Sequence, residues 1–149
     1  MSYIELYAHL VFVTKRHVCA ISEDKEKPLF IYIMKVIESH GCKLLRINAA
    51  LNHVHLLVKY PATLRICDLV QEVKRSSSLM MKNSLRLPGF EGWSHEYAAV
   101  SVSPGGLDAV RNYIINQKEH HKVHYFLDEY RSMLSGEKLE QFSESWFDE

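Results

Sequence analysis

The sequence predicts an α+β fold with four strands and at least three helices. Four short segments carry the alternating or continuous apolar residues that are typical of strands, and the segments between them repeat apolar residues at helical spacing. In chain order the elements read β-α-β-β-α-β, with further helix toward the C-terminal end. This order is typical of a ferredoxin-like domain, in which an antiparallel four-stranded sheet carries two helices on one face.

The first strand is expected over residues 3–14, where both faces are largely apolar, as in a strand at the centre of a sheet. A helix should follow, because Ser22 or Asp24 can cap its start and Gly41 can stop it after about His40. Its apolar stripe consists of Phe30, Ile33, Met34 and Ile37. These two segments predict the first β-α pair of the domain.

The second and third strands are predicted over residues 43–50 and 53–60. Asn52 provides a turn between them, and Pro61 closes the third strand because proline cannot continue the hydrogen-bonded ladder. The third strand is almost continuously apolar after its first residues, which again favours a central position in the sheet.

A second helix is expected from a cap at Thr63 to about Asn83, followed by a loop rich in glycine and proline. The fourth strand is predicted over residues 96–103. A Pro-Gly-Gly break then separates it from a third helix that should start near Leu107 and continue to at least His121. This helix completes the pattern of the domain.

The charge is unevenly distributed, although 18 basic and 18 acidic side chains give a net charge of zero. Residues 126–149 hold seven acidic and two basic side chains, a net charge of −5, which leaves +5 on residues 1–125. We expect residues 1–125 to form the body of the domain and residues 126–149 to form an acidic helix and tail that belong to it. A basic body is compatible with a polyanionic partner.

The cysteines exclude several classes of protein. Cys19, Cys42 and Cys67 are far apart and form no Cys-x-x-Cys pair, which argues against a zinc ribbon or a thioredoxin-type site and for reduced thiols. No apolar run approaches the roughly 18 residues of a membrane helix, and the first residues do not resemble a signal peptide. We therefore expect a cytoplasmic protein without a membrane partner. The chain also contains no Gly-x-x-x-x-Gly-Lys loop, no Gly-x-Ser-x-Gly elbow and no His-Glu-x-x-His motif.

The first candidate site is the pair His53 and His55 at the start of the third strand. Side chains alternate across a strand, so both imidazoles lie on the same face and can share a metal ion. Their place in an otherwise apolar strand costs free energy unless a ligand satisfies them. Taken alone the pair is a weak signal, because a chain with nine histidines often contains a His-x-His, and two half-exposed polar residues explain it as well.

The second candidate is Tyr113, with Gln117 one helical turn further on the same face. A phenolic oxygen can form covalent intermediates, and an amide oxygen can be a ligand. His120 and His121 would follow on this face. Taken alone, a tyrosine at an interface beside a surface glutamine is the more economical interpretation.

The third candidate is a basic stretch in and around the second helix, whose cations and hydroxyls are the side chains that contact phosphates. Asp68 and Glu72 are the acidic residues that oppose it, and a solvated helix face explains it equally well. The candidate DNA-binding residues are Arg65, Lys74, Arg75, Ser76, Ser77 and Lys82.

Together these motifs resemble the single-tyrosine HUH transposases, the small TnpA-like enzymes of bacterial and archaeal insertion sequences, and their REP-associated tyrosine transposase relatives. The resemblance covers residues 3–121. It is carried, in this order, by His53-Val-His55, Lys74-Arg-Ser-Ser77, Trp93 with Tyr97, and Tyr113-Ile-Ile-Asn-Gln117. Arg75 departs from the pattern, since many relatives have a small residue such as glycine there.

The resemblance implies a transposase that cleaves and rejoins single-stranded DNA at hairpin-bearing element ends through a 5′-phosphotyrosine. Tyr113 would be the nucleophile, and His53, His55 and Gln117 would hold a divalent metal, Mg²⁺ or Mn²⁺. The family works as a homodimer in which the tyrosine helix of one subunit serves the histidines of the other. Two alternatives remain: an inactive relative that binds hairpin DNA or RNA, and a ferredoxin-like module that senses a small ligand or metal.

Overall fold

The computed structural model describes residues 1–118, so the predicted acidic helix and tail, the boundary at residue 125, and His120 and His121 lie outside the described part of the chain. The order of elements confirms the prediction from sequence. Its strands are β1 (Leu6–Thr14), β2 (Lys43–Ala49), β3 (His53–Tyr60) and β4 (Trp93–Val102), and its helices are α1 (Glu23–Ser39), α2 (Ile66–Asn83) and α3 (Leu107–Ile115). Short 3-10 turns at Lys15–His17 and Pro104–Gly106 follow β1 and β4.

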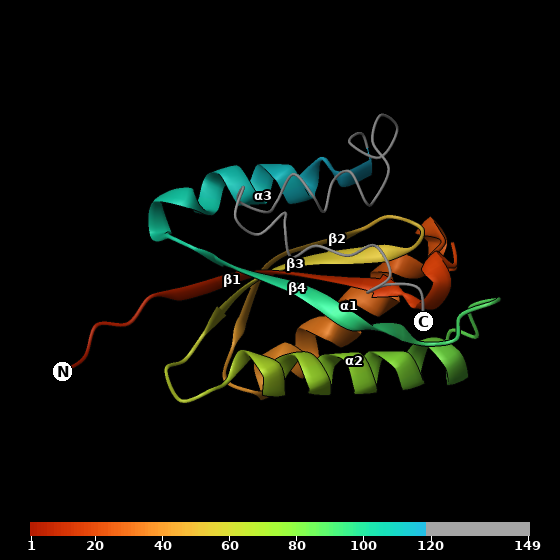
Figure 1. Ribbon diagram of the computed structural model, residues 1–149, viewed down its shortest axis with the longest axis horizontal. Helices are drawn as coiled ribbons and strands as arrows, with labels where there is room; N and C mark the ends of the chain where they lie inside the picture. The colour runs from red at the N-terminus through yellow and green to blue at the C-terminus, as the bar shows by residue number, and fades with distance from the viewer. Residues whose placement is uncertain (119–149) are drawn as a thin grey trace.

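The four strands form one antiparallel sheet in the order β2-β3-β1-β4, which is the ferredoxin-like arrangement. β1 and β3 are the two inner strands, as their apolar sequences predict. Helices α1 and α2 cover one face of this sheet, and α3 lies across the opposite face (Figure 1).

The two faces of the inner strands have different roles. The side chains that point toward α1 and α2 join the main hydrophobic core and include Ala8, Leu10, Phe12, Val54, Leu56 and Val58. Full burial of each large apolar side chain contributes roughly 1.5–3 kcal/mol, so this face supplies much of the driving force for folding. Because side chains alternate along a strand, the intervening residues face α3. They include His9, Val11, His53, His55 and Leu57, and the candidate site therefore lies on the second face of the sheet.

Three elements begin at other residues than the sequence predicts, and one of them is β1, which begins at Leu6 rather than at residue 3. β4 begins at Trp93 rather than residue 96, because Thr14 pairs with Trp93 across an irregularity in the ladder that alternation does not reveal. The α2 helix begins at Ile66 after a turn that joins Leu64 N–H to Pro61 C=O, so Thr63 does not cap it.

The third helix is interrupted, because α3 ends at Ile115 and helical residues resume only at Gln117 and Lys118, where the described part of the chain ends. The prediction of an unbroken helix through Gln117 was wrong, since Asn116 adopts φ −90° and ψ 16° and leaves helical geometry. Asn48 of β2 explains the end of the helix: its Nδ2 donates hydrogen bonds of 2.9 and 3.2 Å to the carbonyl oxygens of Ile114 and Ile115. These are carbonyls of the last turn, which have no partner within the helix.

Candidate active site

The centre of the site is a group of three buried histidines on the face of the sheet that α3 covers. His53 and His55 of β3 are fully buried, and their ring centroids are 5.0 Å apart. His9 of the neighbouring strand β1 is also buried, and its ring centroid lies 5.1 Å from that of His55. His9 Nε2 and His55 Nδ1 are 2.8 Å apart, which is a hydrogen bond between the two rings.

His9 is a site residue that sequence reasoning missed. In the β1–β3 ladder Val11 is opposite His55 and Leu57 is opposite His9, so His9 and His55 are diagonal neighbours on one face. Alternation along β1 places His9 on the face opposite Leu10, but only the pairing register shows which residue of β3 it meets.

Tyr113 reaches the same group from α3. Its ring centroid lies 5.7 Å from that of His55 and 6.0 Å from that of His9, with the rings edge-on in both pairs. The tyrosine and the His-x-His pair, which are far apart in the sequence, therefore meet within a single chain. This juxtaposition places a potential nucleophile beside potential metal ligands.

Gln117 follows the break at Asn116 and is fully buried. Its Nε2 lies 3.4 Å from the carbonyl oxygen of Tyr113, to which it donates, whereas Oε1 has no hydrogen-bond partner among residues 1–118. A buried acceptor without a donor costs on the order of 1–3 kcal/mol. A cation bound by Oε1 would satisfy this atom, so Gln117 fits the role of a metal ligand.

The ring nitrogens of His53 also fit metal binding. Its Nδ1 lies 2.8 Å from Oδ1 of Asn52, and an amide oxygen only accepts, so Nδ1 carries the proton and Nε2 keeps its lone pair. No group of three or more His, Cys, Asp or Glu side chains within residues 1–118 could hold a metal. The donor set predicted from the sequence is instead two imidazoles and the amide oxygen of Gln117, which would suit a divalent ion that tolerates mixed nitrogen and oxygen ligands.

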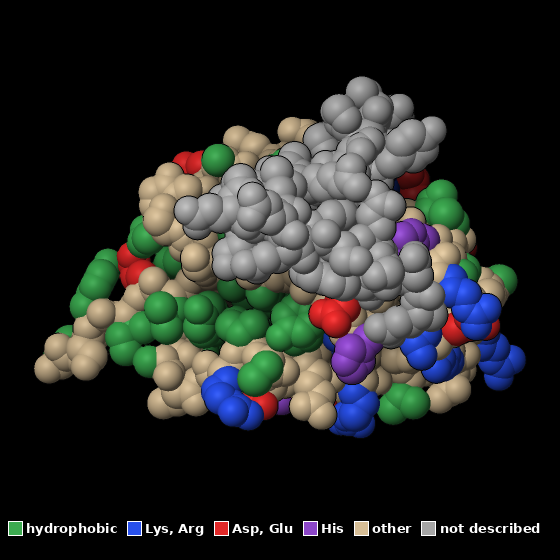
Figure 2. Space-filling view, viewed as in Figure 1, with side chains coloured by type: hydrophobic (Ala, Val, Ile, Leu, Met, Phe, Trp, Pro, Cys, Tyr) green, Lys and Arg blue, Asp and Glu red, His purple; other side chains and the backbone are tan. Residues whose placement is uncertain are grey.

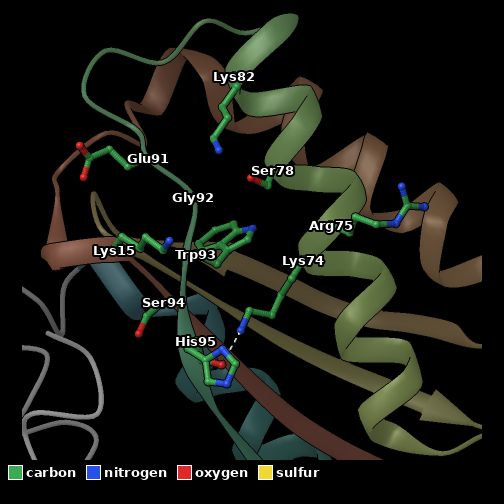
Figure 3. A pocket seen from close by; sticks show the side chains of 10 residues that line it. All are labelled: Lys15, Lys74, Arg75, Ser78, Lys82, Glu91, Gly92, Trp93, Ser94 and His95. Atoms are coloured by element: carbon green, nitrogen blue, oxygen red, sulfur yellow. Dashed lines mark hydrogen bonds between the residues drawn. The ribbon is translucent and has the colours of Figure 1, made fainter. Parts of the chain in front are cut away.

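A hollow away from the histidines, which we call the α2–β4 pocket, lies between α2 and the start of β4 and has a volume of about 330 Å³ (Figure 3). Three of the predicted DNA-binding residues, Lys74, Arg75 and Lys82, line it. The other lining residues are Lys15, Ser78, Glu91, Gly92, Trp93, Ser94 and His95. Figure 2 shows Lys and Arg side chains along α2 and at the end of the molecule that carries the loop between α2 and β4.

Gly92 gives this pocket its shape. Its φ of +114° is in the region that favours glycine, and a Cβ at this position would stand 3.7 Å from Ser78 Oγ and 3.8 Å from Lys82 Nζ. The hydroxyl of Ser78 and the ammonium group of Lys82 therefore both lie beside the backbone of Gly92, which carries no side chain. Ser78 and Lys82 are four residues apart, which places them on one stripe of α2, so both can contact the same anion.

The cations of the pocket differ in their partners. Lys74 donates a 2.9 Å hydrogen bond to the carbonyl of His95 and lies 5.5 Å from the ring centre of Tyr97. Burial raises the pKa of Tyr97, so this ring remains a neutral phenol beside the ammonium group. Arg75 pairs with Glu72, and its hydrogen bonds hold the pKa of that carboxyl below its usual range.

Three other predicted DNA-binding residues are placed elsewhere. Ser77 is fully buried, where it donates to the carbonyl of Val73 and accepts a 2.9 Å hydrogen bond from Trp93 Nε1. Ser76 is also buried and donates to Glu72. Arg65 pairs with Asp68 at the start of α2, roughly 25 Å along the helix from Lys82 at 1.5 Å per residue. The structure thus groups the lysines and Arg75, but not Ser76, Ser77 or Arg65.

Comparison with known protein families gives one match that covers most of the chain: the family described as "Transposase IS200 like" matches residues 2–117. The chain belongs to this family. Its resemblance to tyrosine transposases, drawn from the sequence motifs, is thereby confirmed at the level of the family. Among curated proteins no sequence matches the chain.

Solved structures of transposases share the fold. A candidate transposase from Deinococcus radiodurans R1 superposes with a TM-score of 0.63 at 24% identity, covering 78% of this chain and 93% of that one. A REP-associated tyrosine transposase bound to a REP hairpin gives a TM-score of 0.59 at 14% identity, covering 81% of this chain and 72% of that one. Within residues 1–118 of this IS200-like family member, no helix is long and apolar enough to cross a membrane.

Proposed function

We propose that this member of the IS200-like family cleaves and rejoins single-stranded DNA through a covalent bond between Tyr113 and a 5′-phosphate. The observation that carries the proposal is the position of Tyr113, whose ring lies 5.7 Å from that of the buried His55 in the same chain. A half-buried tyrosine against histidines is not required by the hydrophobic core, which lies on the other face of the sheet. The arrangement instead suits nucleophilic attack on a phosphodiester.

In the proposed reaction Tyr113 Oη forms a bond to phosphorus while the bond between phosphorus and the 3′-oxygen breaks. The products are a 5′-phosphotyrosine and a free 3′-hydroxyl. The phenol loses one proton and the leaving 3′-oxygen gains one, so the step is balanced. One phosphodiester replaces another, so attack by a 3′-hydroxyl on the phosphotyrosine rejoins DNA without a nucleotide cofactor. His53, His55 and Gln117 would hold a divalent ion that, when bound, offsets negative charge on the phosphoryl oxygens.

The chemistry of His53, His55 and Gln117 indicates which divalent ion the site would bind. Mg²⁺ prefers oxygen ligands, whereas imidazole nitrogen suits later first-row ions. Two imidazoles and one amide oxygen are thus expected to bind Mn²⁺ more tightly than Mg²⁺. The cellular abundance of Mg²⁺ still makes either ion a reasonable cofactor.

The α2–β4 pocket is proposed to hold phosphates of the same DNA strand. Lys15 comes directly after β1, and Val13 of β1 pairs with His53, so the pocket and the histidines lie at the same end of the sheet. β4 and β3 flank β1, and two strand spacings amount to about 10 Å. A single strand of a few nucleotides that passes around the β4 edge of the sheet could therefore contact the lysines on the α2 side and the histidines on the α3 side. The hairpin bound by the REP-associated relative supports hairpin-bearing DNA as the substrate.

We also propose that the active form is a homodimer in which α3 is exchanged between subunits. In the single chain, Asn48 holds the end of α3, and Lys118 Nζ forms hydrogen bonds of 3.0 Å to Glu26 and 2.9 Å to Asn48 Oδ1. Exchange of an identical element preserves such contacts, now between two chains. The Pro104–Gly106 turn is where the chain would change direction, and a Cβ at Gly105 would meet no atom within 4 Å.

The proposal is tested with oligonucleotides that carry hairpins from the DNA flanking the gene. Incubation with Mn²⁺ should give a protein–DNA adduct that survives a denaturing gel with single-stranded but not double-stranded substrate. Hairpin binding in a gel shift without any adduct would instead support the inactive relative. Absence of binding to any DNA would support the ligand-sensing module.

A further inference from the structure

His9 is the one member of the buried histidine group to which the family motifs assign no role. It lies at the centre of the sheet, where β1 pairs it with Leu57 on one side and Val100 on the other. It is 5% exposed, and its ring contacts those of both His55 and Tyr113. A polar ring buried at this position costs free energy unless it forms a hydrogen bond, and His9 forms one with His55.

That hydrogen bond can be formed in two ways. Either His55 Nδ1–H donates to His9 Nε2, or His9 Nε2–H donates to His55 Nδ1. In the first case the neutral His55 ring has its lone pair on Nε2, the atom that can bind a metal. In the second case His55 Nε2 carries a proton and cannot be a ligand.

We propose that His9 is a positioning residue that accepts the Nδ1 proton of His55 and so presents Nε2 of His55 to the divalent ion. The inference rests on the proposed function, because it assigns a role within the same metal site. His9 does not itself contact the ion or the DNA. It fixes the tautomer and the ring orientation of His55.

The neighbouring histidine supports this assignment independently. His53 Nδ1 donates to Asn52 Oδ1 over 2.8 Å, and His55 Nδ1 meets His9 Nε2 at the same distance of 2.8 Å. In both rings the δ nitrogen therefore lies within hydrogen-bond distance of a side-chain atom that is able to accept its proton. The ε nitrogens of the two rings are then equivalent in chemistry, as expected for two ligands of one ion.

The position of His9 on β1 explains why its side chain can hold the His55 ring in place. β1 pairs with strands on both sides, and the apolar face behind His9 packs into the core through Leu10 and Ala8. A residue on such a strand has little freedom to move. Loss of an outer hydrogen-bond partner typically weakens metal binding by roughly 10- to 100-fold, which sets the expected size of the effect.

The test uses the full chain without DNA and has two readouts other than activity. Ring ¹⁵N NMR of the metal-free protein reports which nitrogen of His55 carries the proton, and the free Mn²⁺ signal in electron paramagnetic resonance reports the dissociation constant. The variants are His9→Phe, which removes the acceptor at similar size, and His9→Gln, whose Oε1 can accept in its place. His40→Phe, at the end of α1, is the control for loss of a histidine away from the site.

We expect His55 Nδ1–H in the wild-type protein and in His9→Gln, with Mn²⁺ binding by His9→Gln within a few-fold of wild type. We expect His9→Phe to bind Mn²⁺ roughly 10- to 100-fold more weakly and His40→Phe to bind it normally. A wild-type His55 with its proton on Nε2, or His9→Phe with unchanged Mn²⁺ affinity, overturns the role of His9. The NMR result on the wild-type protein decides this even if His9→Phe fails to fold. Absence of Mn²⁺ binding by the wild-type protein would contradict the metal site itself and thus the proposed function, separately from the tautomer.

Discussion

The side-chain amide of Asn48 in β2 donates a 2.9 Å hydrogen bond to the carbonyl of Ile114, at the end of the helix that carries Tyr113. Asn48 also donates to Ile115, and its Oδ1 accepts from Lys118. One side chain thus fixes where α3 ends and where the chain goes next. We expect the position of Tyr113 over the histidines to depend on that attachment.

We therefore predict that Asn48→Ala slows formation of the covalent adduct. Two hydrogen bonds at about 1 kcal/mol each correspond to roughly tenfold or more in rate if they hold the reactive geometry. DNA affinity should be unchanged, because Asn48 lies away from the α2–β4 pocket. Adduct formation is measured under single-turnover conditions, with Asn112→Ala, an exposed asparagine of α3, as the matched control. Equal rates for Asn48→Ala and wild type would show that this attachment does not position Tyr113.

Removal of the metal should stop cleavage and leave hairpin binding largely intact. The ion serves the phosphate that reacts, whereas affinity comes from cationic contacts spread over the surface. We expect this result from a chelator and from His55→Ala, measured as adduct on a denaturing gel beside a gel shift. If cleavage persisted after thorough chelation and did not increase when Mn²⁺ was added, the metal assignment would be contradicted.

The lysines of the α2–β4 pocket should account for part of the salt dependence of DNA binding. Lys74→Gln and Lys82→Gln are each expected to weaken binding and to reduce the slope of log affinity against log salt by about 0.7 per lost contact to single-stranded DNA. Lys35→Gln, an exposed lysine of α1, is the control and should leave the slope unchanged. If both pocket variants kept the wild-type slope, the pocket would be an ordinary solvated surface.

The exchanged dimer predicts complementation between two inactive variants. Tyr113→Phe protein is mixed with protein carrying both His53→Ala and His55→Ala, and subunits are allowed to exchange. In a shared-site dimer, one of the two sites then combines intact histidines with an intact tyrosine, so cleavage returns. If cleavage stayed absent after heterodimers were shown to form, each site would be built within one chain.

Much of the fold and part of the site could be predicted from sequence, because their signals are local. Alternating apolar residues predicted strand β3 at the bounds that it has, residues 53–60, and the same alternation placed His53 and His55 on one face. The basic character of α2 was likewise visible in the spacing of Lys74 and Lys82. These features depend on residues near one another in the chain.

The remainder depends on contacts between distant segments. His9 joins His55 only through the register of β1 against β3, across 46 residues, and no local pattern encodes that register. The end of α3 was missed because Asn48 acts on it from 66 residues away. Gly92, which shapes the α2–β4 pocket, looked like an ordinary loop glycine until its neighbours Ser78 and Lys82 were known.

The account's central claim is that Tyr113 attacks the phosphate, and the most direct measurement is the mass of the tryptic peptide that carries DNA after reaction with a hairpin oligonucleotide and Mn²⁺. We predict that the adduct lies on the peptide containing Tyr113 and that Tyr113→Phe keeps its fold and its hairpin affinity while forming no adduct, because only the nucleophilic oxygen is lost. An adduct on another tyrosine, such as Tyr125, or an undiminished adduct in Tyr113→Phe, would contradict the account.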